Sequence, residues 1–151
     1  MPQSLSRIFL HLIFSTRKRI PFLVDAELRD HTHAYLAEVC RQLGVLPLRI
    51  NGTEDHVHIL CAMSRTRTVA DLVKELKRTS SKWLKQQGEE LLCFYWQGGY
   101  GAFSVSPSHV DEVERYIACQ PEHHKTLSFQ DEFRRILKKY GVQYDEQYVW
   151  D

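Results

Sequence analysis

The run Asp55-His56-Val57-His58-Ile59-Leu60 decides how the rest of the chain is interpreted, because two histidines flank one apolar residue at the start of a hydrophobic run. In a β-strand successive side chains point to opposite faces, so His56 and His58 share one face and Val57 and Ile59 share the other. Two neutral imidazoles side by side on a strand can bind one metal ion. Two polar residues on a solvated sheet face are the alternative, and the short motif alone does not exclude it.

The composition predicts one globular domain. The chain has 151 residues, of which 43% are hydrophobic, so we expect a single domain over residues 1–151. The net charge of +1 neither requires nor excludes a polyanionic partner. The four cysteines are scattered, without a Cys-x-x-Cys pair, which predicts buried, reduced thiols. We recognise no secretory leader and no apolar run of membrane-spanning length, so we expect a cytoplasmic protein.

The first two thirds of the chain alternate strand and helix patterns. Strands are predicted at residues 7–15 and 46–52 and from about His56 to about Met63, and helices at about 26–43 and 69–87. The Asn51-Gly52 pair indicates a hairpin between the second and third strands. His11 lies inside the first, strongly apolar strand, and we interpret it as a core histidine rather than a ligand.

The last third carries three further features. Residues 93–105 are rich in aromatic side chains and glycine, and they are interpreted as core, as a fourth strand or as platforms on which bases stack. Ser106-Pro107 is typical of a helix start, so a helix is predicted from about 107 to 120, where Pro121 ends it. A C-terminal helix and a tail that packs as an arm occupy residues 127–151.

The order of these elements favours an α+β, ferredoxin-like βαββαβ fold. We expect an antiparallel sheet with helices on one face and the opposite face free for a substrate. Because Val57 and Ile59 must face the helices, His56 and His58 are expected on the free face.

Basic side chains gather in two places. One cluster follows the first strand, and the other occupies the polar side of the predicted helix at 69–87, where no acidic residue follows Glu75. A helix face whose charges are nearly all positive is interpreted as a solvated surface or as a contact to a phosphate backbone. The candidate DNA-binding residues are Arg17, Lys18, Arg19, Lys74, Lys77, Arg78, Lys82 and Lys85.

Tyr116 and Gln120 are four residues apart, or one helical turn, on the predicted helix at 107–120. Tyr116 has an alternative as a core residue of an amphipathic helix, but its pairing with Gln120 has no packing reason. The adjacent His123 and His124 could form a second metal site, although we expect them to face solvent.

Together these stretches resemble one family. The Asp55–Leu60 run, the basic helix, the sequence Gly-Tyr-Gly-Ala-Phe-Ser-Val-Ser at 99–106 and Tyr116-Ile-Ala-Cys-Gln120-Pro-Glu-His-His are similar to the single-tyrosine HUH transposases of small bacterial insertion sequences. The resemblance extends from the first strand to the helix that contains Phe129.

The resemblance implies a metal-dependent DNA transposase that cleaves and rejoins single-stranded DNA with hairpin ends. It implies His56, His58 and Gln120 as ligands of Mg²⁺ or Mn²⁺, and Tyr116 as the nucleophile that forms a 5′-phosphotyrosine. It also implies a homodimer in which the tyrosine helix packs on the partner's histidines, giving composite active sites.

Two other functions stay open at this point. One is a non-catalytic module of the same fold that binds single-stranded DNA or RNA. The other is a domesticated relative that acts on chromosomal repeats. The chemistry implied for a metal-dependent transposase is consistent. A divalent cation stabilises charge on a phosphodiester, and a covalent phosphotyrosine keeps the bond energy available for rejoining the strand.

Overall fold

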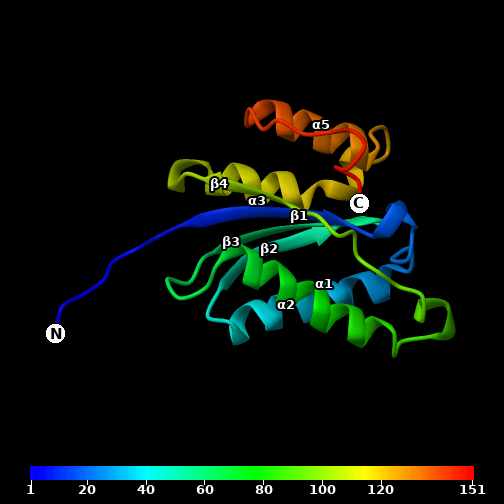
Figure 1. Cartoon of the computed structure of the whole chain (residues 1–151), viewed down its shortest axis with the longest axis horizontal. Coiled ribbons are helices and arrows are strands. Elements are labelled where there is room, and N and C mark those ends of the chain that lie inside the picture. The colour runs from blue at the N-terminus through cyan, green and yellow to red at the C-terminus, as the bar shows by residue number, and fades with distance from the viewer.

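The computed structural model describes residues 1–151 (Figure 1). The strands are β1 (Phe9–Ser15), β2 (Leu46–Gly52), β3 (His56–Ala62) and β4 (Gly101–Val105). The α-helices are α1 (Ala26–Gln42), α2 (Val69–Leu84), α3 (Val110–Ala118), α4 (Gln120–His123) and α5 (Phe129–Lys139). Short 3-10 helices are η1 (Arg17–Arg19), η2 (Glu89–Leu91) and η3 (Pro107–His109).

The sheet has the order β2-β3-β1-β4, and every neighbouring pair is antiparallel. With α1 and α2 between the strands, this is the βαββαβ arrangement expected from the sequence, and the fold class is confirmed. The pairing places Ile13 opposite His58 and His11 opposite Phe103. His11 lies on β1 and the pair His56 and His58 lies on β3, so all three are on the two central strands of the sheet.

One face of the sheet packs against α1 and α2 (Figure 1). The side chains of Leu12, Phe14, Val57 and Ile59 are fully buried in this layer. The helix α1 begins at Asp25, whose side chain accepts hydrogen bonds from the backbone of its first turn. This layer is the larger hydrophobic core of the chain.

The opposite face is not free, which corrects the expectation from the sequence. The helices α3 and α5 lie over it (Figure 1), and Phe129, Phe133 and Leu137 of α5 pack against Ile13 of β1. Consequently His56 and His58 are fully buried instead of lying on an open surface. Three apolar side chains on one stripe of α5 need a partner surface, and this face of the sheet supplies it.

The predicted helix at 107–120 is also different in detail. The chain starts as η3, continues as α3 to Ala118, breaks at Cys119 and resumes as α4, which contains Pro121 in its first turn. Proline is well tolerated in the first turn of a helix, so it begins α4 instead of ending the preceding helix. Tyr116 and Gln120 therefore belong to two successive helices.

The tail at 140–151 packs as an arm, as expected. Trp150 lies with its ring centre 6.4 Å from that of Phe129 and 6.1 Å from that of Phe133. No helix has the length and apolar content needed to cross a membrane.

The cysteines match the prediction in part. All four are free, and Cys40 and Cys61 are buried, which raises the pKa of each thiol to about 12. Cys93 and Cys119 are exposed, so the expectation of burial is wrong for this pair.

Candidate active site

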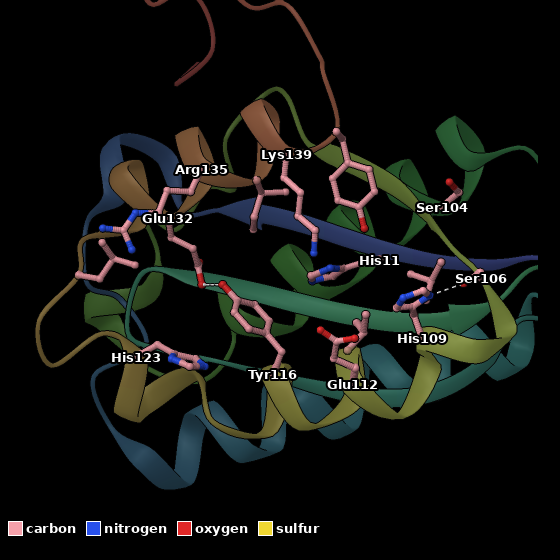
Figure 2. Close-up of a pocket in the computed structure, with 15 residues that line it drawn as sticks. His11, Ser104, Ser106, His109, Glu112, Tyr116, His123, Glu132, Arg135 and Lys139 are labelled. Atoms are coloured by element: carbon pink, nitrogen blue, oxygen red, sulfur yellow. Dashed lines mark hydrogen bonds between the residues drawn. The ribbon is translucent and has the colours of Figure 1, made fainter.

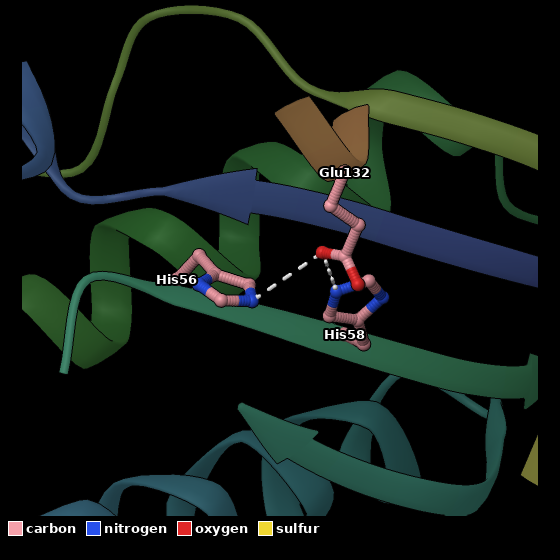
Figure 3. A group of neighbouring side chains, drawn as sticks. All are labelled: His56, His58 and Glu132. Carbon is pink, nitrogen blue, oxygen red and sulfur yellow. Dashed lines mark hydrogen bonds and ion pairs between the residues drawn. The ribbon is translucent and has the colours of Figure 1, made fainter. Parts of the chain in front are cut away.

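His56 and His58 project from β3 into the space between the sheet and the C-terminal helices (Figure 3). Both side chains are fully buried, and their ring centres are 5.2 Å apart. The alternation predicted from the sequence therefore holds, because Val57 and Ile59 enter the core on the other face.

The turn before β3 orients His56. Its Nδ1 lies 2.7 Å from Asp55 Oδ1 and 2.9 Å from Thr53 Oγ1. A proton on Nδ1 satisfies the carboxylate and leaves the Nε2 lone pair directed into the site, as in many metal-binding histidines. Gly52 permits the tight turn, because a Cβ there would lie 2.1 Å from the carbonyl oxygen of His56.

A second histidine orients His58. Its Nδ1 lies 2.8 Å from Nε2 of His11 on β1, and one of the two nitrogens donates the hydrogen bond. Burial lowers the pKa of His58 to about 4, and burial together with His58 holds the pKa of His11 well below its usual range. Both rings are therefore neutral near pH 7, the form in which imidazole binds a cation. His11 is buried, as expected, but it contacts a candidate ligand.

Gln120 and Tyr116 approach the histidines from the second layer. Gln120 is fully buried, and its Oε1 lies 2.9 Å from Nε2 of His56. The ring centre of Tyr116 lies 5.9 Å from that of His58. The structure thus brings all four predicted residues together within a single chain.

Asn51 on β2 fixes the position of the tyrosine helix. Its amide Nδ2 donates to the carbonyls of Ile117 and Ala118, at 3.1 and 3.2 Å. These carbonyls lie in the last turn of α3, where backbone acceptors lack helical partners. The hydrogen bonds attach the end of α3, and hence Tyr116, to the edge of the sheet.

Glu132 on α5 lies at the centre of the site, and the sequence analysis missed it. Its carboxylate is buried, with Oε1 3.0 Å from Nε2 of His58 and 3.6 Å from Nε2 of His56 (Figure 3). The Oε2 atom accepts hydrogen bonds from Gln120 Nε2 at 2.8 Å and from the Tyr116 hydroxyl (Figure 2). The one available signal was an acidic residue three positions after Phe129, on the buried stripe of the helix.

His124 also belongs to the site, contrary to the expectation that it faces solvent. Its side chain is only 9% exposed, and its Nε2 lies 3.1 Å from Oε1 of Glu132. Burial opposes its charge, but the nearby carboxylate outweighs burial and raises the pKa of His124. His123 is partly buried as well and stacks on the Tyr116 ring, with centres 4.9 Å apart.

The donor atoms fit a divalent cation. Nε2 of His56 and His58 and a carboxylate oxygen of Glu132 all lie within 4.8 Å of one another, and Gln120 Oε1 is adjacent. Two of these separations are 2.9 and 3.0 Å, close to the roughly 3.0 Å between neighbouring ligands in an octahedron with bonds of about 2.1 Å. Mixed imidazole and oxygen donors suit Mn²⁺, and the oxygen donors suit Mg²⁺.

The charge of Glu132 governs the ionisation of its neighbours. Burial opposes its ionisation, but the hydrogen bonds from His124 and His58 hold the pKa of this carboxyl well below its usual range. Burial raises the pKa of Tyr116, and the adjacent carboxylate raises it further. Near pH 7 the site therefore contains an ionised Glu132 and a protonated Tyr116.

Sequence comparison identifies the family. The family described as "Transposase IS200 like" matches residues 4–120, which include the histidine pair, Tyr116 and Gln120. The chain belongs to the IS200-like transposase family. The match ends before Glu132 and His124, so these two residues of the site lie outside the matched region.

Individual relatives agree with this assignment. The transposase is 27% identical over 115 residues to the ISDra2 transposase TnpA of Deinococcus radiodurans, a match that covers 73% of this chain and 81% of the relative. It superposes on the crystal structure of a candidate transposase from Deinococcus radiodurans R1 with a TM-score of 0.62 and 24% identity, covering 80% of this chain and 95% of the other.

A second solved structure shares the fold at lower identity. It is a REP-associated tyrosine transposase bound to a REP hairpin, with a TM-score of 0.60 and 12% identity, covering 84% of this chain and 76% of the other. At these identities the two solved structures support the fold alone.

The predicted DNA-binding residues of the transposase lie away from the histidines. The helix α2 covers the opposite face of the sheet (Figure 1), so its lysines do not line the site. Lys74 and Lys82 are exposed, and Lys85 lies 4.0 Å above the centre of the Tyr95 ring. Arg17 and Lys18 are exposed on η1, and Arg17 lies 5.8 Å from the Tyr95 ring centre.

Three of these cations are bound by a backbone carbonyl or a carboxylate of the chain. The ammonium of Lys77 donates to the carbonyls of Gln97 and Gly99 at 2.8 and 2.6 Å, and burial lowers its pKa to about 8. Arg78 pairs with Glu75 at 2.7 Å, and Arg19 donates to the carbonyl of Trp150 at 2.6 Å. Lys77 therefore holds the glycine-rich segment in place.

Proposed function

We propose that this transposase cleaves and rejoins single-stranded DNA at hairpin-bearing ends, through a 5′-phosphotyrosine at Tyr116. His56, His58 and Gln120 would hold Mg²⁺ or Mn²⁺, with Glu132 as a further oxygen donor. The observation that carries the proposal is the convergence of a tyrosine hydroxyl on two oriented imidazoles, an amide and a carboxylate in one buried site. A module that only binds nucleic acid needs no such arrangement.

The residues divide the chemistry among them. The Tyr116 oxygen forms a bond to phosphorus, the bond from phosphorus to the 3′-oxygen breaks, and the cut strand leaves with a 3′-hydroxyl. The hydroxyl proton passes to solvent or to a neighbouring base, and a second 3′-hydroxyl reverses the step to join strands. A bound divalent cation supplies charge stabilisation on the phosphate oxygens. Asp55 and His11 keep the two imidazoles in the orientation that this requires.

The opposite face supplies a second contact with DNA. Tyr95 is 50% exposed, and Arg17 of η1 and the half-buried Lys85 just after α2 lie against its ring. Lys74 and Lys82 are exposed on α2. Cations interleaved with an exposed aromatic ring are typical of a surface that binds nucleic acid. The shared fold with a protein bound to a REP hairpin supports a DNA hairpin as the partner of this surface.

Every residue of the proposed site is supplied by one chain, so we propose that cleavage takes place within a single copy. The homodimer with composite sites implied by the resemblance would require α3 to leave its own sheet. That movement would break the hydrogen bonds from Asn51 to Ile117 and Ala118.

Incubation with a 3′-labelled single-stranded DNA hairpin and Mn²⁺ tests the proposal, because the tyrosine would stay joined to the 5′-phosphate of the labelled downstream fragment. We expect a protein–DNA adduct that survives denaturing electrophoresis. Tyr116→Phe should abolish the adduct while DNA binding persists, and His56→Ala should abolish it through loss of the metal. Tyr100→Phe, which alters an exposed tyrosine, is the control. An adduct formed by Tyr116→Phe would refute the nucleophile assignment, and binding without any adduct would favour a non-catalytic module.

A further inference from the structure

A cleft of about 700 Å³ lies between α3 and α5 and reaches the ring of Tyr116 (Figure 2). Its floor includes His11 of β1, and its far end is formed by Ser104 of β4 and by Ser106, which follows that strand. The volume is within the range of about 300–1,000 Å³ found for ligand pockets. The cleft therefore has room for a short, extended segment of substrate but not for a duplex.

One wall of the cleft is cationic. Arg135 and Lys139 are four residues apart on α5, both line the cleft, and neither forms a salt bridge (Figure 2). The charge of Arg135 lowers the pKa of Tyr116, and the charge of Lys139 lowers the pKa of His11. Both cations therefore lie close enough to act on the end of the cleft that contains Tyr116. Helix positions four apart lie about 5–6 Å from each other, which suits two phosphates of an extended strand.

The other groups in the cleft leave this positive charge available. The carboxylate of Glu132 is engaged by hydrogen-bond donors from Tyr116, Gln120 and His58. Glu112 on the opposite wall is exposed to solvent. At the end of α5 the ring of Tyr140 is 38% exposed and provides an aromatic surface for a base.

We propose that this cleft binds the single strand next to the scissile phosphate, with Arg135 and Lys139 on successive phosphates and Tyr140 against a base. The assignment deepens the proposed function and rests on it for the position of the scissile bond. It adds a second nucleic-acid surface, separated by the sheet from the cations of α2. Lys138, the neighbour of Lys139, does not line the cleft and provides a matched control.

Binding without cleavage tests the cleft directly. The probe is a 5′-fluorescein-labelled oligodeoxythymidine of ten residues, titrated with the full chain in EDTA at several salt concentrations. The double variant Arg135→Gln/Lys139→Gln should reduce the slope of log Kd against log salt by about 1.4, since each phosphate contact on a single strand contributes about 0.7. Lys138→Gln should lower the slope by no more than half of that amount.

Location is tested by cross-linking the same probe with 4-thiothymidine at its centre. We expect cross-linked peptides from α5 and α3, and their loss in the double variant. Cross-links confined to α2 and η1, or a double variant that behaves as Lys138→Gln does, would overturn the proposal. Tenfold tighter binding of oligouridine would also overturn it, since RNA would then be the occupant.

The two proposals fail in different ways. If no tyrosyl adduct forms with any hairpin but the double variant still loses the salt-dependent contacts, the proposed function fails and the cleft remains a site for single strands. If the adduct forms normally in the double variant and its binding slope is unchanged, the cleft assignment fails and the proposed function stands.

Discussion

The hydroxyl of Tyr116 donates its hydrogen bond to Oε2 of Glu132, the same carboxylate whose other oxygen contacts His58. A tyrosine must lose its proton to become an effective nucleophile, and an adjacent negative charge disfavours the phenolate. Glu132 therefore restrains the proposed nucleophile as long as its charge is not neutralised. A cation bound at the histidines would also bind the Glu132 carboxylate, and its positive charge would relieve the restraint on Tyr116.

Replacing Glu132 with glutamine should lower the pKa of Tyr116, because the buried negative charge is removed while the shape of the side chain is kept. Carbon-13 NMR of tyrosines labelled at Cζ measures this titration, and the Tyr116→Phe spectrum identifies the resonance. Glu112→Gln changes an exposed acid near the same cleft and should leave the Tyr116 titration unchanged. An equal effect of both variants would show that general charge, not this contact, sets the pKa.

Asp55→Asn should weaken Mn²⁺ binding by about 10- to 100-fold, the usual effect of losing a carboxylate that orients a histidine ligand. Isothermal titration calorimetry of the full chain measures the affinity without any dependence on DNA cleavage. Glu54→Gln is the matched control, because this neighbouring acid is exposed and makes no hydrogen bond to His56. Unchanged affinity in Asp55→Asn would remove Asp55 from the metal site.

Mixing two inactive variants should not restore activity if each site is built within one chain. Tyr116→Phe keeps the histidines, and His56→Ala keeps the tyrosine, so only exchange of α3 between two copies could assemble an intact site. The measurement is the amount of DNA adduct after the variants are refolded together. Recovery of about a quarter of the wild-type adduct or more would instead support composite sites in a homodimer.

Gly101→Ala should lower the free energy of unfolding by about 1–3 kcal/mol, the usual cost of overpacking. A Cβ at this position would lie 2.6 Å from the Phe133 ring and 2.8 Å from the Phe103 ring. Gly98→Ala is the control, because its nearest contact would be an ordinary 3.6 Å to Asp151. Urea unfolding measures both variants, and equal stability would indicate that α5 shifts to accommodate the methyl group.

His33 should make the chain less stable in mild acid. Burial lowers its pKa to about 4, and its Nε2 has no hydrogen-bond partner. Between pH 6.5 and 4 the unfolded chain binds a proton that the folded chain refuses, so the free energy of unfolding falls as pH falls. The loss from this residue approaches about 3 kcal/mol near pH 4.

The matched variants for this prediction are on the same helix. His33→Gln should flatten the pH dependence of the urea midpoint, whereas His31→Gln, at an exposed position, should retain the wild-type slope. Identical slopes in all three proteins would assign the acid sensitivity to other histidines.

The β3 part of the site could be predicted because strand alternation is a local rule. Two residues of separation were sufficient to place His56 and His58 on one face, and helical spacing placed Tyr116 near Gln120. The break at Cys119 was not predicted, because Pro121 is compatible both with the end of one helix and with the first turn of the next.

The rest of the site depends on long-range packing. Glu132 and His124 reach the histidines only because α5 folds back over the sheet, and no short spacing in the sequence encodes that return. Lys77 was grouped with the surface cations for the same reason, since its acceptors Gln97 and Gly99 belong to a distant segment. The sequence analysis therefore missed Glu132 and His124, and misplaced Lys77, because their partners lie elsewhere along the chain.

The second layer on the sheet has a consequence for the order of events during synthesis. His56 and His58 leave the ribosome well before α3 to α5. The strands β1 and β3 and the turn before β3 already contain both imidazoles and their partners His11 and Asp55. Until Phe129 and Phe133 dock against Ile13, these rings face water on a half-covered sheet. The imidazole pair becomes enclosed only when α5 packs over the sheet and brings Glu132 beside it.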